Sequence, residues 1–92
     1  KWLNVARLYN AAKRGDAAVL RRLIEECVPF DHRNVHGVTP LWHAAHPGHI
    51  EVVKALLATN AVDVNVRSIA GRTPIFWASA NGHAEIVELL LR

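Results

Sequence analysis

Residues 71–83 read Gly-Arg-Thr-Pro-Ile-Phe-Trp-Ala-Ser-Ala-Asn-Gly-His, and this stretch decides the fold. Its opening recurs 34 residues upstream as Gly-Val-Thr-Pro-Leu at 37–41, and its closing Gly-His pair recurs at the same shift at 48–49. Similar apolar runs follow both copies, at 51–57 and 85–91. Self-similarity at such a fixed period is typical of proteins built from stacked repeats, because one unit cannot bury its apolar face alone.

Each copy carries the start and stop signals of two short helices. Thr39 is expected to cap the first helix with its hydroxyl, and the proline after it suits the first helical position, where no N–H donor is needed. This helix is predicted over about 40–46 and is followed by Gly48, which can adopt the left-handed conformation that ends a helix. A second helix, with one apolar face, is predicted over about 50–58 and ends at Asn60.

A fainter third copy lies near the N-terminus, where Gly15 matches Gly48 at a shift of 33 residues. This copy lacks the Thr-Pro pair and carries several arginines, so it is predicted to be a capping repeat. We therefore expect a single domain with three parts: an N-terminal capping repeat, 1–33, a central repeat, 34–67, and an incomplete last repeat, 68–92.

In its period, its Thr-Pro signature and its Gly-His pairs, the chain resembles the ankyrin repeat family over essentially its whole length. The resemblance implies an all-α solenoid of stacked antiparallel helix pairs with short β-hairpin or turn connections. Residues 64–66, Val-Asn-Val, are predicted to be extended and to lead into such a connection. The resemblance also implies a concave surface, made by the hairpin tips and the first helices, that holds other proteins.

Three aromatic residues depart from the family pattern. Trp42 and Phe76 stand where the family signature has histidine, and Tyr9 occupies the matching place in the first copy. In the family this histidine is partly buried and hydrogen-bonded near the interface between repeats. We expect the three aromatic side chains to form a column that packs between repeats, with contact to a partner as the alternative.

Alignment with the family also gives a candidate partner-binding surface. Trp77 is its strongest candidate, because an exposed tryptophan beside Arg67 and Arg72 is typical of an interface anchor. The alternative is that Trp77 folds over the neighbouring helix and is half-buried. The residues predicted to bind a protein partner are Arg33, Asn34, Val35, His36, Val38, His43, His46, Arg67, Ser68, Ile69, Ala70, Arg72, Trp77 and Ala80.

Five of the six histidines fall between His32 and His49. His43 and His46 are three apart on one helix face, a spacing that can present two imidazoles to one metal ion. No carboxylate or cysteine falls at a matching position, so no metal and no cofactor are predicted. A pH-responsive patch is the alternative use of this cluster. His49 and His83 fit the family's Gly-His pair, for which a local backbone hydrogen bond is expected.

Composition and motifs argue against several other classes of protein. The net charge of +3 is modest and no dense basic face is evident, so nucleic acid is not an expected partner. No nucleophile elbow or phosphate-binding loop is present, so no enzymatic activity is predicted. No apolar run approaches the roughly 18–20 residues that span a bilayer. The single cysteine, Cys27, cannot form an internal disulfide and favours an intracellular location, cytoplasmic or nuclear.

The sequence therefore predicts a non-catalytic protein–protein interaction module. The main alternative is a set of structural spacer repeats within a longer array, because the sequence stops in the middle of an apolar helix pattern. That pattern comprises Ile86, Val87, Leu90 and Leu91 and is followed by no polar capping repeat, so end-to-end self-association through the last repeat is a second expectation. A metal-binding or pH-switching module built on the histidines is the third reading.

Overall fold

The computed structural model describes residues 2–33 and 36–91, and in this part of the chain it contains helices and no strand. This result confirms the predicted all-α fold. The helices are α1 (Trp2–Arg14), α2 (Ala17–Glu25), α3 (Pro40–Ala45), α4 (Ile50–Leu57), α5 (Pro74–Ala80) and α6 (Ala84–Leu91).

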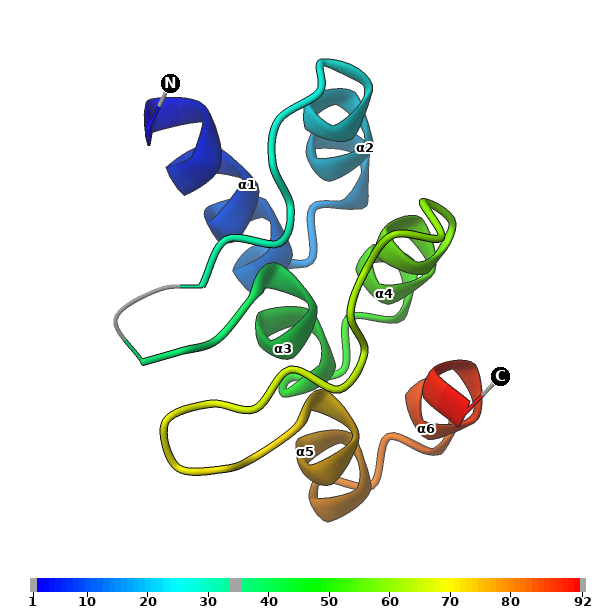
Figure 1. The fold of residues 1–92 in the computed structure, drawn as a ribbon. Helices are drawn as coiled ribbons and strands as arrows, with labels where there is room; N and C mark the ends of the chain where they lie inside the picture. Colours follow the sequence, from blue (N-terminus) through cyan, green and yellow to red (C-terminus); the bar gives the residue numbers. More distant parts are fainter. Residues whose placement is uncertain (1, 34–35, 92) are drawn as a thin grey trace.

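The helices form three antiparallel pairs, α1/α2, α3/α4 and α5/α6, that stack one after another (Figure 1). The first helices of the pairs, α1, α3 and α5, contact one another in one row, and α2, α4 and α6 form a second row. We call the first row and the turns that precede α3 and α5 the inner face. None of the described helices is long and apolar enough to cross a bilayer.

The core lies between the two rows and consists of apolar side chains contributed by every helix. Leu8 and Leu20 are fully buried in the first pair, Leu41 and Leu56 in the second, and Ile86 in the third. Because each pair buries its side chains partly against the next, the core is continuous along the stack.

Thr-Pro pairs begin α3 and α5, but the two threonines behave differently. The Thr73 hydroxyl accepts a hydrogen bond from the Phe76 backbone N–H at 3.3 Å, as a helix cap should. Thr39 makes no such bond, and its hydroxyl oxygen is buried without a partner among the described residues. The expectation that the Thr39 hydroxyl caps its helix is therefore wrong. Both threonines have extended backbones, so the difference lies in the orientation of the side chain.

Left-handed residues that are not glycine follow two of the second helices, α2 and α4. Cys27 has φ 63° just after α2, and Asn60 has φ 57° just after α4. The prediction that Asn60 ends its helix is confirmed, and α3 and α4 each end within one residue of the predicted position. A left-handed cysteine lacks the local side-chain bonding that makes asparagine tolerable in this conformation.

The segment that the sequence predicts to be extended, 64–66, begins with a turn in the structure. Val64 and Asn65 form a turn, in which the Asp63 carboxylate accepts the Asn65 N–H at 2.9 Å, so the prediction of an extended 64–66 is wrong. The short-range side-chain bond offers the backbone an alternative to a strand. A second turn is closed by Ser68 N–H donating to the Arg72 carbonyl at 2.9 Å.

The histidines of the Gly-His pairs join neighbouring repeats. His49 Nε2 lies 2.9 Å from the Lys13 carbonyl oxygen, and His83 Nε2 lies 3.2 Å from the His46 carbonyl oxygen. The local backbone bond expected for these histidines is therefore wrong, because each ring reaches across to the preceding repeat. The His83 ring can do so because it lies over Gly48, where a Cβ atom would come within 2.7 Å of it.

Candidate functional site

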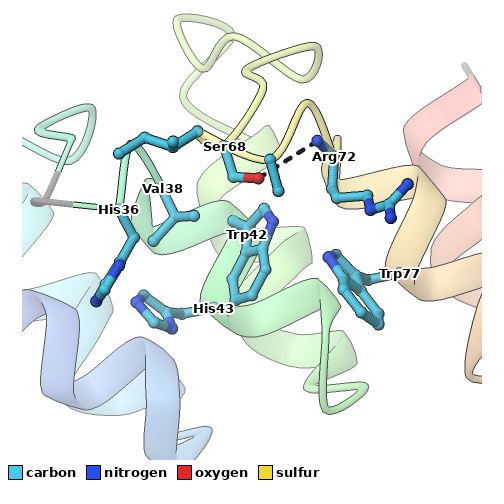
Figure 2. Close-up of a pocket in the computed structure, with 9 residues that line it drawn as sticks. His36, Val38, Trp42, His43, Ser68, Arg72 and Trp77 are labelled. Carbon is cyan, nitrogen blue, oxygen red and sulfur yellow. Dashed lines mark hydrogen bonds between the residues drawn. The ribbon is translucent and has the colours of Figure 1, made fainter.

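The inner face contains a groove of about 680 Å³ between α3, α5 and the turns before them (Figure 2). Eight of the predicted partner-binding residues line it: His36, Val38, His43, Ser68, Ile69, Ala70, Arg72 and Trp77. The structure adds Trp42, for which packing between repeats is the expectation from the sequence and contact with a partner the alternative. The turn before α3 is tied to the turn before α5 because the Ile69 N–H donates to the His36 carbonyl at 2.9 Å.

Two half-buried tryptophan side chains form the floor of the groove. The Trp42 and Trp77 rings lie edge to face with their centroids 6.1 Å apart. Both indole nitrogens are buried and have no hydrogen-bond acceptor among the described residues. In Figure 2 these nitrogens lie at the ends of the rings nearest Ser68 and Arg72. An N–H group that is buried without a partner costs roughly 1–3 kcal/mol of stability.

A chain of aromatic contacts runs from this floor across the repeats. The Tyr9 ring meets His43 with centroids 5.5 Å apart, and His43 meets Trp42 at 5.4 Å. His46 stacks on Trp42 at 5.2 Å and touches Trp77 at 4.7 Å. The predicted column of Tyr9, Trp42 and Phe76 thus takes another form, in which His43, His46 and Trp77 mediate the contacts.

Phe76 lies at the end of this series of aromatic contacts. Its side chain is 42% exposed, more than those of Tyr9 and Trp42. Its ring meets Trp77 edge to face at 5.3 Å, and the Arg72 guanidinium carbon lies 4.6 Å from the ring centroid. This cation–π contact holds the charged end of Arg72 beside the groove.

The remaining predicted residues lie outside the described groove lining. Arg33 Nε donates to the Gly37 carbonyl at 3.1 Å, and its Nη2 donates to the Arg67 carbonyl at 2.5 Å. Arg33 therefore holds the two turns together and is less available to a partner. His46 is part of the aromatic chain, while Arg67 and Ala80 are exposed elsewhere on the inner face. The predicted residues Asn34 and Val35 lie outside the described residues.

Tyr9 is a supporting residue that the sequence indicated only by its register with Trp42. Its hydroxyl lies within hydrogen-bond distance of the carbonyl oxygens of His32 and Val38. The contact fixes α1 against the turn that carries Val38, one wall of the groove. Only the folded chain reveals this bond, because the residues it joins are 23 and 29 positions apart.

Among the described residues, the first helices and the groove lining carry basic side chains but no acidic ones. The helices α1, α3 and α5 contain no Asp or Glu, and none of the described groove residues carries a carboxylate. The acidic residues lie in the second helices and the loops: Asp16, Glu25, Glu26, Asp31, Glu51, Asp63, Glu85 and Glu88. The groove therefore combines an apolar floor with hydrogen-bond donors and a cation, Arg72.

The environment of the groove alters the pKa of His43. Its pKa is lowered from the ordinary 6.5, first by burial of the ring and then by the nearby charges of Lys13, His46 and His36. Burial disfavours the charged imidazolium, and like charges add to this effect. The His43 side chain is consequently neutral at pH 7.

Within residues 2–33 and 36–91, no three His, Cys, Asp or Glu side chains gather in an arrangement suited to a metal ion. The two histidines considered for such a site, His43 and His46, pack instead against Tyr9 and the tryptophan floor. The structure thus gives these histidines a packing role.

Comparison with known proteins identifies the repeat. A protein-family model for ankyrin repeats (three copies) matches residues 8–92. Osteoclast-stimulating factor 1 from Xenopus laevis is 39% identical over 58 residues, which cover 63% of this chain and 27% of that protein. Ankyrin repeat domain-containing protein 29 from Homo sapiens is 42% identical over 57 residues, which cover 61% of this chain and 19% of that protein.

The matched stretch is therefore less than a third of the length of either relative. Ankyrin repeats are generally protein–protein interaction modules, and the match extends over nearly all of the described residues. The helix pairs and the Thr-Pro starts agree with this match. The chain belongs to the ankyrin repeat family.

Proposed function

We propose that this chain is a non-catalytic protein-interaction module that binds its partner in the groove of the inner face. The observation that carries the proposal is the convergence of eight predicted contact residues on one groove with an apolar tryptophan floor. Sites of this kind, with an apolar centre and a few polar groups at the edge, are typical of protein interfaces.

The rim of the groove supports the same function. Ile69 is 77% exposed, although it is a large apolar side chain, and it stands at the tip of the turn before α5. Arg72 is exposed as well and makes no ion pair within the described part of the chain. An exposed apolar residue beside an unpaired cation can be covered by a partner without disturbing the core.

The proposal is tested by affinity capture from a cell lysate with three forms of the chain. These are the parent, the double variant Ile69→Asp, Arg72→Glu, and the control Arg67→Glu. Both altered groove residues are exposed, so the double variant should keep its fold, which circular dichroism checks. A protein retained by the parent and the control but lost by the double variant supports the proposal. Equal retention by all three forms, or none by any, contradicts it.

A second candidate function is that of a structural spacer, and exposed apolar side chains on the last helix pair favour it. Leu91 of α6 is 71% exposed and Phe76 of α5 is 42% exposed. Such side chains would be covered by a further repeat or by another copy of the chain. A spacer should become clearly more stable when it is extended by further repeats, and unchanged stability would contradict this candidate. The same side chains favour end-to-end self-association, for which sedimentation velocity at rising concentration should reveal dimers that Leu91→Lys abolishes; a monomer at every concentration would contradict that association.

We also place the protein in the cytoplasm or nucleus. The exposed free thiol of Cys27 fits a reducing compartment. A fluorescent fusion of the whole protein tests this location directly, and a secreted fusion would contradict it.

A further inference from the structure

We infer that the partner segment is acidic: the groove takes an extended stretch of a partner protein that inserts one apolar side chain between the tryptophan floor and Ile69 and places a carboxylate beside Arg72. This inference rests on the proposed function and deepens it by giving the chemistry of the partner.

The lining of the groove favours an apolar side chain of the partner. Val38 is buried at 3% exposure, and Ile69, which is 77% exposed, lies against the turn before α3, where its N–H donates to the His36 carbonyl. The half-buried rings of Trp42 and Trp77 lie below Ser68 and Arg72 (Figure 2). A side chain that enters this space removes apolar surface of both molecules from water, which contributes about 25 cal/mol for each Å² buried.

The polar groups that line the groove include Arg72 and the two indole N–H groups. Arg72 and the two indole groups can only donate hydrogen bonds, so they need acceptors from the partner. The indole N–H groups of Trp42 and Trp77 find no acceptor among the described residues of the free protein. Both nitrogens lie at the ends of the rings nearest Ser68 and Arg72 (Figure 2), the side on which we place the partner's backbone carbonyl or carboxylate.

The charge distribution favours an acidic segment. Arg72 is the one permanently charged side chain among the described groove residues, and no carboxylate lies among them to neutralise it. α1 carries Arg7, Lys13 and Arg14 and no acidic residue, and α3 and α5 carry no Asp, Glu, Lys or Arg, so nothing on the first helices offsets the attraction between Arg72 and a carboxylate. Nucleic acid fits less well, because its binding depends on several Lys or Arg side chains that contact successive phosphates.

The inference is tested by selection from a random-peptide phage library on the intact chain. The parent, Arg72→Glu and Arg67→Glu are each used as bait. The two variants change the net charge equally, but only Arg72 lines the groove. We expect the parent and the Arg67→Glu control to select peptides in which Asp or Glu flanks an apolar residue. Arg72→Glu should lose this preference, and it should bind the selected peptides about tenfold more weakly.

The outcomes separate this inference from the proposed function. Selected peptides without an acidic preference that still require Ile69 would overturn the inference and leave the proposed function standing. Peptides that bind equally well to the variant Ile69→Asp, Arg72→Glu would overturn both. Displacement of the peptides by a single-stranded oligonucleotide at equal concentration would also overturn the inference, because the groove would then bind phosphates.

A second measurement tests the indole donors. Trp77→Phe keeps an aromatic ring in the floor but removes its N–H group. The selected acidic peptide should bind this variant roughly three- to tenfold more weakly, which corresponds to the loss of one hydrogen bond. Unchanged affinity would overturn the assignment of the Trp77 N–H as a donor to the partner.

Discussion

Trp42 of α3 and Trp77 of α5 meet edge to face, with ring centroids 6.1 Å apart and ring planes at 75°. This pair joins two repeats and at the same time forms the floor of the groove. Aromatic pairs of this geometry contribute about 0.5–1.5 kcal/mol beyond their buried area. Truncation of either ring therefore lowers stability as well as affinity. For this reason the main binding tests change the exposed residues Ile69 and Arg72, and Trp77 is replaced only by phenylalanine, which keeps an aromatic ring in the floor.

The contact between Gly48 and His83 predicts unequal effects of two similar substitutions. Gly48→Ala and Gly82→Ala both place a side chain at positive φ, at a cost of about 1 kcal/mol. The added Cβ atom meets His83 only at Gly48, since nothing lies within 4 Å of Gly82. Urea denaturation should show Gly48→Ala less stable than Gly82→Ala by about 1–3 kcal/mol. Equal losses would show that the His83 ring moves away freely.

The two Thr-Pro starts predict opposite effects of the same substitution. Thr73→Val removes the cap on the Phe76 N–H and should destabilise the fold by about 0.5–2 kcal/mol. Thr39→Val removes a buried hydroxyl that has no partner among the described residues, so it should leave stability unchanged or increase it slightly. Thermal unfolding of the two variants measures this contrast. A loss in Thr39→Val as large as that in Thr73→Val would contradict it.

The left-handed conformation of Cys27 predicts a stabilising substitution. Glycine adopts positive φ without the steric cost that a Cβ atom imposes, so Cys27→Gly should raise the free energy of unfolding by about 0.5–1 kcal/mol. Asn60→Gly is the matched control at the end of α4 and should gain less, because asparagine tolerates this conformation. Chemical denaturation checks both variants, and a destabilised Cys27→Gly would disprove the steric explanation.

The lowered pKa of His43 predicts that stability falls in mild acid. Below about pH 6.5 this residue binds a proton more readily in the unfolded chain than in the folded chain. The free energy of unfolding therefore decreases as pH falls. The contribution is fully present above pH 6.5 and is lost as pH drops towards the lowered pKa. His43→Gln should weaken the pH dependence between about pH 7 and 5 in urea titrations. An identical dependence in both proteins would contradict the assignment.

Much of the fold could be predicted because its signals are local. Proline at the first helical position and left-handed residues at helix ends depend on a few neighbouring atoms, so α3 and α4 lie almost where the sequence places them. The errors concern contacts that local patterns do not encode. They are the orientation of the Thr39 hydroxyl, the turn at Val64 and the reach of His83 to the preceding repeat.

For the candidate site, the sequence predicts the face of the molecule but not which of its side chains are free to contact a partner. Repeat register places His43 and Trp77 on the inner face, but it does not show which side chains are already engaged. Arg33 bonds to the Arg67 carbonyl because the two turns stack closely, a fact of tertiary structure. The signature position of Trp42 leaves packing between repeats and partner contact as alternatives, whereas in the structure its ring both packs against His46 and lines the groove.

The central claim, that a protein partner occupies the groove, is tested most directly by chemical-shift mapping of the ¹⁵N-labelled chain. Addition of the captured partner or a selected acidic peptide should shift the indole N–H signals of Trp42 and Trp77 and the backbone amides of 68–72. The backbone amide signals of the second row of helices, α2, α4 and α6, which we call the outer helices, should not shift. Shifts confined to those outer helices, with unchanged indole signals, would contradict the account and place the partner on the opposite face.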